Sequence, residues 1–425
     1  MTKRFSIIAI FLISFSIYLS NIYSNYKKDF KEQGYRNLAP SGDVIPNTFL
    51  PYQIIKSHTL KFNEIRFFLR NFDDKTREPY FFYTNKDDQT FSVYPIMSGL
   101  FALPTYFIPI MLNKIPALVY HINILKILML GRITASFYTA LSVVIMYLVL
   151  SRISKNKRLV ILFTIFYAFG TTTLSISSRG MWQHTISEFL NAIILLLLLK
   201  AEEKPSFYKY IGFLLGLAVL TRPTNFLIAA PIALYVFLKK RKYFTTFFLY
   251  TIPSIAFLLI YNNYAFGSPF SEGYGAQNGL LWNTPLWYSL PSYFINPARG
   301  FLFISPPLLL SFITMYRSLK KDYLYKYLSI GCVLTMVLYG MWNTWDGANG
   351  FGYRMLTDIV PFLTLFAFEE AARIKNRRVF LVISFLILYS CYVHLNAIYF
   401  KKGRCDRNDN WTFKCLSPGI KLRSL

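Results

Sequence analysis

One carboxylate stands apart in the first polar loop of the sequence. Asp43 follows Ser41 and Gly42 in LAPSGDVIPNTFLPYQIIKSH (residues 38–58), and no other charged residue lies within six positions on either side. Ser-Gly-Asp is a favourable turn sequence, so a turn residue is the simplest interpretation. A loop carboxylate can also act as a general base when a hydroxyl binds within its reach. These residues alone leave both interpretations open.

Residues suited to binding phosphate and sugar recur in the other polar segments. Phosphate is bound by Arg or Lys with help from His, Tyr or backbone donors, whereas sugars bind against aromatic rings and beside Asn, Gln or Asp side chains. The candidates for phosphate binding are Arg222, Arg299, Arg354, Lys56 and His184. The candidates for sugar or acceptor binding are Trp182, Asn262, Trp345, Asp346 and Tyr353.

Some of these residues also have ordinary structural explanations. Trp182 and His184 in SRGMWQH fit an aromatic belt at the membrane surface, and Arg222 before Pro223 fits a helix break. Segment 342–358, WNTWDGANGFGYRMLTD, is harder to explain in that way, because its three glycines let the backbone approach a ligand closely. Ligand binding is the favoured interpretation of that segment.

Long apolar runs must position these residues. Of the 425 residues, 54% are hydrophobic and 16% are charged, whereas soluble proteins carry about 25% charged residues. Apolar runs separated by short basic patches are typical of a polytopic helical membrane protein. The sequence therefore predicts an all-α membrane protein with about 11–13 transmembrane helices. Runs 115–130 and 133–150 are expected to be separate, and 115–130 can lie along the membrane surface.

The formal net charge of +26 follows this topology. Its basic residues cluster between apolar runs, so nucleic acid is not an expected partner. Under the positive-inside rule, Lys3, Arg4 and the segments SRISKNKR, KKRK, RSLKK and RIKNRR face the cytoplasm. The polar candidates then share the extracytoplasmic face of a plasma or inner membrane.

A single membrane domain is expected over residues 1–400. Its larger external loops are 23–93 and 261–300, and an external tail follows at 401–425. The N-terminal apolar stretch lacks a small-x-small cleavage site, so we expect it to remain as the first helix.

The four cysteines divide into two kinds. Cys332 and Cys391 fall in apolar runs and are expected to be packed thiols. Cys405 and Cys415 lie in the polar tail and can pair if the tail faces an oxidising compartment.

The order of the outer segments carries a family resemblance. The long loop with Gly-Asp comes first, followed by MWQH, GLAVLTRPTNFL, YNNYAFGSPFSEGY, NPARGFLFISPPLLL and GFGYRMLTDIVPFL. This order resembles that of the multispanning GT-C glycosyltransferases, which include protein O-mannosyltransferases and lipid A aminoarabinose transferases. The resemblance covers roughly residues 40–370.

The resemblance implies an activity and roles for particular residues. Such enzymes use an acidic residue of the first external loop as the catalytic base, and Asp43 occupies that place. Their donors are typically sugars on polyprenyl phosphate or diphosphate, which the basic candidates would hold, with Arg222, Arg299 and Arg354 foremost. Val44 stands where many members carry a second acid, which disfavours a divalent metal and predicts a base that needs no cofactor. The acceptor can be a glycan, a lipid or a protein.

A transporter or flippase of lipid-linked sugars is the main alternative. Transporters usually contain internal repeats and bind their substrates near the middle of the bilayer. This sequence has no visible repeat, and its polar clusters lie at the outer ends of the apolar runs. Both features favour the enzyme, in contact with membrane lipids, over the transporter.

Overall fold

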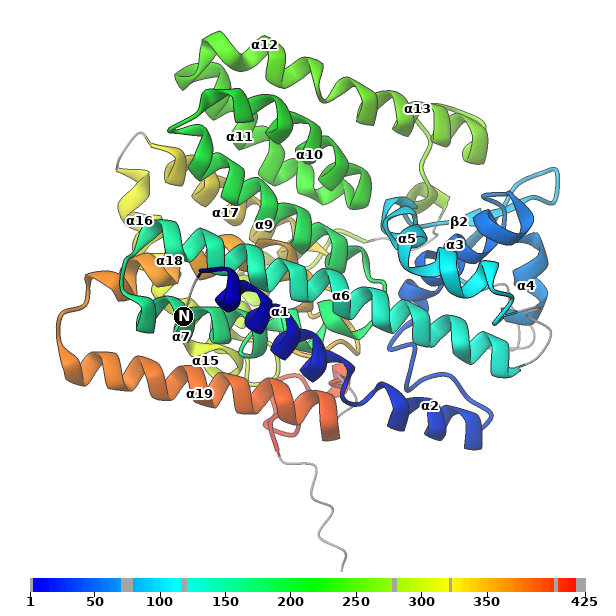
Figure 1. Ribbon diagram of the computed structural model, residues 1–425, viewed down its shortest axis with the longest axis horizontal. Coiled ribbons are helices and arrows are strands. Elements are labelled where there is room, and N and C mark those ends of the chain that lie inside the picture. Colours follow the sequence, from blue (N-terminus) through cyan, green and yellow to red (C-terminus); the bar gives the residue numbers. More distant parts are fainter. Residues whose placement is uncertain are drawn as a thin grey trace, which may run out of the picture.

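The computed structural model describes residues 3–69, 79–115, 121–276, 281–320, 323–400 and 404–417. Helices form nearly all of the regular structure in these ranges (Figure 1). The α-helices are α1 (Lys3–Leu19), α2 (Ile22–Lys31), α3 (Ile45–Ser57), α4 (Asn63–Leu69), α5 (Met97–Met111), α6 (His121–Ile153), α7 (Lys157–Phe169), α8 (Thr172–Ser175), α9 (Gln183–Ala201), α10 (Tyr208–Thr221), α11 (Phe226–Lys239), α12 (Arg241–Leu249), α13 (Ile252–Phe266), α14 (Leu286–Ile295), α15 (Phe301–Ile304), α16 (Leu309–Leu319), α17 (Leu324–Met341), α18 (Val360–Arg373) and α19 (Arg377–Phe400). The short 3-10 helices are η1 (Gly42–Val44), η3 (Ser177–Arg179), η4 (Pro205–Phe207), η5 (Pro223–Asn225), η6 (Gly273–Ala276), η7 (Pro306–Leu308), η8 (Arg354–Ile359) and η9 (Arg407–Asp409). Strands β1 (Phe82–Thr84) and β2 (Thr90–Ser92) pair antiparallel in the first loop.

Seven helical stretches in the described ranges are long and apolar enough to cross a membrane. They are Arg4–Lys31, Ile122–Ile153, Lys157–Ser175, Gln183–Ala201, Arg241–Phe266, Leu324–Met341 and Arg377–Phe400. Shorter apolar stretches accompany them at Met97–Met111, Pro205–Thr221 and Pro223–Lys239. The prediction of an all-helical polytopic membrane protein is confirmed. Its estimate of about 11–13 spans exceeds the number of helices that qualify by length, because several apolar stretches are short.

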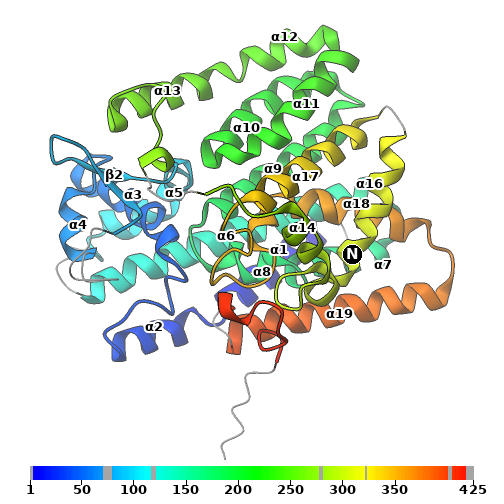
Figure 2. The same cartoon turned by 180° about the vertical axis from the view of Figure 1, so that it is seen from behind.

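The loops divide between two ends of the helix cluster. Junctions α11–α12, α16–α17 and α18–α19, which carry basic segments, lie together at the left of Figure 1 and at the right of Figure 2. The first loop, with α2, α3, α4 and the β-hairpin, lies at the opposite end. The basic segments are therefore well separated from the polar loop that contains Asp43.

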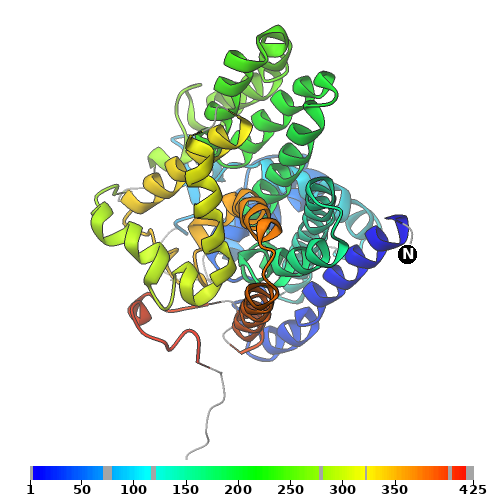
Figure 3. The same cartoon turned by 90° about the vertical axis from the view of Figure 1, so that its left-hand side faces the viewer.

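Helix α18 lies in the middle of the cluster, orange in the end view of Figure 3. Its residues 360–368 are all buried, because α7, α9, α16 and α17 pack around it. A helix that is apolar on all sides needs such a central position. Since η8 leads directly into α18, the packing of α18 also holds Arg354 and Asp358 of η8 in place.

The structure joins two runs that the sequence was expected to keep apart. Residues 116–120 lie outside the described ranges, and from His121 onward one helix, α6, continues for 33 residues. Arg132 interrupts the apolar pattern, but its buried side chain donates to Asn21 Oδ1 (3.2 Å) and Asn37 O (3.4 Å). A helix of this length spans about 50 Å, more than the ~30 Å of a hydrocarbon core. Helix α6 accordingly also reaches the first loop, where it packs against α3.

The cysteines behave as their positions predict. Cys405 and Cys415 form a disulfide in the loop that follows α19, whereas Cys332 and Cys391 are buried free thiols. We expect the denatured protein to react with two equivalents of a thiol reagent before reduction and four afterwards. The Cys332→Ala/Cys391→Ala variant is the control and should react only after reduction. Four reactive thiols in the unreduced protein would contradict the assignment.

Candidate active site

A cavity of about 510 Å³ lies between the first loop, the start of α9 and the segment before α18. Its polar and aromatic lining comprises Tyr35, Arg36, Asp43, Tyr80, Tyr94, Trp182, Gln183, His184, Arg222, Tyr274, Trp342, Arg354 and Arg404. Four of these residues are arginines, and Asp43 is the sole carboxylate among the residues that line it. The lining therefore favours a ligand that is both anionic and able to contact aromatic rings.

Asp43 reaches the cavity from a tight turn. It lies in η1, where Ser41 Oγ accepts a hydrogen bond from the Asp43 backbone N–H (3.4 Å). Gly42 gives Tyr80 the room to approach Asp43, because a Cβ atom at position 42 would lie 2.5 Å from the Tyr80 hydroxyl. The two interpretations of Asp43 are thus compatible: the turn places the carboxylate in the cavity.

The Asp43 carboxylate is held from both sides. Its Oδ1 accepts hydrogen bonds from the hydroxyls of Tyr80 (2.9 Å) and Tyr94 (3.0 Å). Its Oδ2 forms an ion pair with Arg354. The side chain of Asp43 remains 24% exposed, so a ligand in the cavity can still approach it.

Arg354 connects Asp43 to an aromatic wall. Its guanidinium lies 4.0 Å from the centre of the Trp182 ring, in cation–π geometry, and donates to Gly347 O (3.3 Å). Gly347 has φ of +74°, and a Cβ there would lie 2.9 Å from Arg354 Cβ. Glycine at 347 therefore gives Arg354 the room to lie between Trp182 and Asp43.

These contacts set the ionisation of Asp43. Burial on its own would raise the pKa of the carboxyl, but the positive charge of Arg354 and hydrogen bonds from Arg354, Tyr80 and Tyr94 outweigh burial and lower that pKa. Burial and the nearby Asp43 charge raise the pKa of both tyrosines. At neutral pH the site thus contains an ionised carboxylate and two protonated phenols.

A second ion pair forms the inner wall. Arg222 Nη1 donates to Asp358 Oδ2 (2.6 Å), and His184 Nδ1 lies 3.1 Å from Asp358 Oδ1. The Arg222 guanidinium also lies 4.8 Å from the centre of the Tyr339 ring. All three charged or titratable side chains are buried, so Asp358 orients Arg222 and His184, which both line the cavity.

Five of the residues selected from the sequence line this cavity: Asp43, Trp182, His184, Arg222 and Arg354. Lys56 and Asn262 do not line it. Lys56 donates to Asn113 Oδ1 (3.1 Å) at an exposed position, and Asn262 donates to Pro269 O (3.2 Å) after α13. We therefore leave both residues out of the candidate site.

Two further residues selected from the sequence, Trp345 and Tyr353, pack outside the cavity lining. Trp345 packs edge-on against Tyr288 and Tyr293, and the Tyr353 hydroxyl donates to Ser305 Oγ (2.7 Å). These contacts hold the segment before η8 without placing either aromatic residue in the cavity lining.

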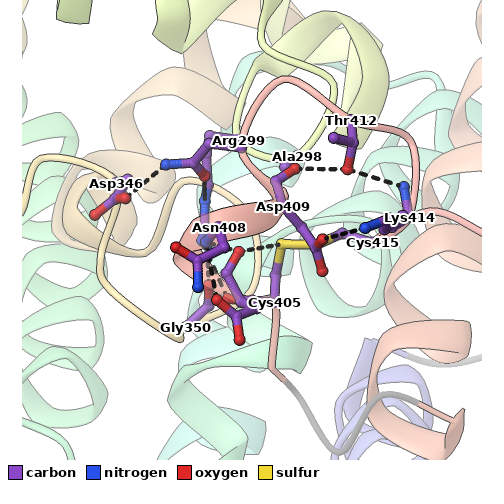
Figure 4. The surroundings of a disulfide bond; sticks show 12 residues. Ala298, Arg299, Asp346, Gly350, Cys405, Asn408, Asp409, Thr412, Lys414 and Cys415 are labelled. Atoms are coloured by element: carbon purple, nitrogen blue, oxygen red, sulfur yellow. Dashed lines mark hydrogen bonds and ion pairs between the residues drawn. A yellow bond between two sulfur atoms is a disulfide. The ribbon is translucent and has the colours of Figure 1, made fainter.

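Arg299 and Asp346 also hold backbone. Arg299 donates to Ala348 O (2.8 Å) and Cys405 O (3.1 Å) and also contacts Gly350 O, and Figure 4 shows it between Gly350 and the disulfide loop. Asp346 pairs with Arg407 Nε (3.2 Å). The guanidinium of Arg299 is committed to these carbonyls, so it is not positioned to bind phosphate in the cavity.

Several cavity residues were not selected from the sequence: Tyr80, Tyr94, Gln183, Tyr274, Arg36, Arg404 and, beside the cavity, Asp358. The tyrosines are hard to recognise, because the chain contains 32 of them. Asp358 stood in the quoted motif GFGYRMLTDIVPFL, and its position four residues after Arg354 was a usable signal.

A multidentate metal cluster is not found in the described residues. No group of three or more His, Cys, Asp or Glu side chains there could hold a metal ion. The carboxylates Asp43 and Asp358 are instead each paired with an arginine.

The fold and cavity define a polytopic helical membrane protein with a polar, arginine-rich site at one end of its helix cluster. Neither a protein-family model nor a curated protein sequence matches the chain. Among solved structures, ArnT from Cupriavidus metallidurans, in a crystal structure bound to undecaprenyl phosphate, is similar, with a TM-score of 0.54 at 9% sequence identity. The match covers 93% of this chain and 66% of the ArnT chain.

This likeness concerns the fold. It confirms the predicted all-helical polytopic architecture, which is of the kind that ArnT has. The chain spans about two thirds of the length of ArnT, with 66% of that chain covered.

Proposed function

We propose that the protein is an integral-membrane glycosyltransferase that moves a sugar from a polyprenyl-phosphate-linked donor to an acceptor on the extracytoplasmic face. The observation that carries this proposal is the Asp43 carboxylate, the sole carboxylate among the residues that line a cavity rich in arginines and aromatic rings. The GT-C-like fold, shared with a protein solved in complex with undecaprenyl phosphate, supports the choice of donor.

Asp43 is the general base of the proposed reaction. It accepts the proton of an acceptor hydroxyl while that oxygen forms a bond to the anomeric carbon of the donor. The bond between the anomeric carbon and the phosphate oxygen breaks, and its electron pair leaves with polyprenyl phosphate. Since this leaving group is an anion of low basicity, it needs positive charge nearby more than it needs a general acid. We assign no metal to this step.

Arg222, His184 and Arg354 are proposed to bind the donor phosphate. Arg222 is held in place by Asp358 (2.6 Å), so it can stabilise the developing charge without reorganising. Arg354 is paired with Asp43 before the donor binds. We propose that the phosphate draws Arg354 away from Asp43 and along the face of Trp182. Donor binding then frees the carboxylate oxygen that must accept the proton.

Removal of Arg354 is expected to change the pH dependence. The pKa of Asp43 is held low by Arg354 against the effect of burial, so the wild-type base is ionised down to acidic pH. In Arg354→Gln the positive charge that lowers this pKa is lost, so the pKa of Asp43 rises. We expect the acidic limb of kcat/KM to move to higher pH, because that limb reports the base of the free enzyme.

The control for this pH profile is Arg317→Gln, which removes an arginine paired with Glu370 near the opposite end of the cluster. Its acidic limb should stay at the wild-type position. An unshifted limb in Arg354→Gln, measured with the same donor, would contradict the pairing of Arg354 with the base.

Two features support the extracytoplasmic side. The Cys405–Cys415 disulfide lies beside the cavity, and disulfides persist mainly in oxidising compartments. The basic junctions lie at the far end of the helix cluster (Figure 1), where the positive-inside rule expects the cytoplasm. Labelling of a cysteine placed at Asp88, an exposed first-loop residue, by an impermeant reagent on intact cells tests this orientation. Protection of that cysteine until the cells are lysed would contradict it.

A transferase cleaves the sugar–phosphate bond of the donor, whereas a transporter leaves it intact, so cleavage of this bond distinguishes the two functions. The purified protein with a polyprenyl-phosphate sugar and a set of acceptors should release sugar-free polyprenyl phosphate. A flippase in liposomes would move the donor between leaflets and leave the sugar–phosphate bond intact. Movement without cleavage would reject the transferase.

A further inference from the structure

One arginine of the cavity comes from the loop that follows the last long helix, α19. Arg404 lies in the loop after α19, next to the disulfide-bonded Cys405, and lines the same cavity as Asp43. The catalytic proposal above gives Arg404 no role. The contacts of its backbone nevertheless hold Arg404 at the cavity wall.

Backbone contacts fix Arg404 and the next residue, Cys405. Arg404 forms an antiparallel β-bridge with Gly350, and the Cys405 N–H donates to Asn349 O (3.0 Å). Arg299 Nη2 donates to Cys405 O (3.1 Å). Figure 4 shows Arg299 and Gly350 close to Cys405 of the disulfide. The loop therefore presents Arg404 to the cavity from a rigid base.

In the described part of the first loop, the Arg404 side chain donates hydrogen bonds to two backbone carbonyls. Its Nη2 donates to Arg36 O (3.1 Å) and Ala39 O (3.3 Å). Its Nε is buried and makes no hydrogen bond with the residues that the structure describes. Arg222 and Arg354 each have a carboxylate partner, whereas no ion pair of Arg404 is found in the described parts of the chain.

A partly buried cation without a carboxylate partner is unfavourable unless an anion binds beside it. A neighbouring positive charge increases that cost, because Arg36 lines the same cavity and its backbone carbonyl accepts a hydrogen bond from Arg404. A bound phosphate would satisfy the free Nε–H and compensate the charge, since the guanidinium fork matches two phosphate oxygens.

We propose that Arg404 binds a second phosphate group in the cavity, at a position separate from the one between Arg222 and Arg354. This proposal rests on the proposed function, because it assigns the first position to the donor phosphate. The second phosphate belongs either to a diphosphate-linked donor or to the acceptor. The disulfide loop after α19 thereby becomes part of the substrate site.

Binding measurements on the purified full-length protein test this proposal. Trp182 and Trp342 line the cavity, so their fluorescence can report binding of polyprenyl monophosphate, polyprenyl diphosphate and glycerol phosphate. In Arg404→Gln we expect unchanged affinity for the monophosphate lipid and a loss of about tenfold or more for one of the other two probes. A loss for the diphosphate lipid identifies the donor as the source, and a loss for glycerol phosphate identifies the acceptor.

Two further variants keep the result interpretable. Arg407→Gln removes the same charge from the same loop, but its half-exposed side chain pairs with Asp346 and does not line the cavity. It should bind all three probes like the wild type. Arg404→Lys keeps the positive charge and should lose less affinity than Arg404→Gln, which separates phosphate binding from a general disturbance of the loop.

Two results would overturn the proposal. Unchanged binding of all three probes by Arg404→Gln would show that Arg404 only holds the first loop. Equal weakening for the monophosphate and diphosphate lipids would place Arg404 at the first phosphate. A wild-type protein that binds neither lipid would instead reject the proposed donor, and its glycerol phosphate binding would still test Arg404.

Discussion

Replacement of Asp43 by Asn is expected to lower kcat by about 10²–10⁴-fold, the usual loss when a general base is removed. The amide has nearly the same shape and can still accept the hydrogen bonds of Tyr80 (2.9 Å) and Tyr94 (3.0 Å). It cannot take the acceptor proton. The measurement is single-turnover release of sugar-free polyprenyl phosphate at saturating donor, so that a change in affinity does not enter the rate.

The matched control for this variant is Asp88→Asn. Asp88 belongs to the same external loop, but its side chain is 79% exposed and pairs with Arg66. It should turn over like the wild type. Since Asp43→Asn leaves Arg354 free to bind phosphate, donor affinity should be kept or increased. A folded Asp43→Asn protein with the wild-type rate would reject Asp43 as the base.

Replacement of Asp358 by Asn should have the largest effect on stability. Asp358 is buried and binds both Arg222 and His184. Loss of its charge leaves the Arg222 guanidinium buried without a counterion, which typically costs about 3–5 kcal/mol. We expect the free energy of unfolding in detergent to fall by that amount, together with weaker binding of polyprenyl phosphate.

An exposed ion pair provides the comparison. Arg152 and Glu203 pair near the opposite end of the cluster, and the side chain of Glu203 is 74% exposed. Glu203→Gln should therefore lower the free energy of unfolding by no more than ~1 kcal/mol. If Asp358→Asn were no more destabilising than Glu203→Gln, Asp358 would not be the partner that holds Arg222 at the cavity.

The sequence was most informative about the class of fold. Hydropathy and the spacing of basic patches predicted a helical membrane protein, because apolar length and charge act locally along the chain. The sequence did not predict that α6 continues without a break through Arg132, because the partners of Arg132 come from other parts of the fold. Arg132 breaks the apolar pattern, yet Asn21 and Asn37, far away in sequence, accept its hydrogen bonds.

The candidate site was recoverable only in part. Asp43 and Arg354 stood out by their isolation and by the glycines around them, and the structure pairs them across 311 positions. Tyr80 and Tyr94 carry no such signal, because their role depends on where the β-hairpin packs. Arg299 looked like a phosphate ligand in sequence, but the carbonyls that it binds come from segments that meet only in the folded protein.

The most direct measurement is the fate of a defined polyprenyl-phosphate sugar incubated with purified wild type and Asp43→Asn in the presence of acceptors. Mass spectrometry of the lipid follows the sugar–phosphate bond, and a separate binding assay confirms that both proteins hold the donor. We predict sugar-free polyprenyl phosphate and a glycosylated acceptor with the wild type, and intact donor with Asp43→Asn. Intact donor with both proteins across all acceptors, or equal cleavage by both, would contradict a glycosyltransferase that uses Asp43 as its base.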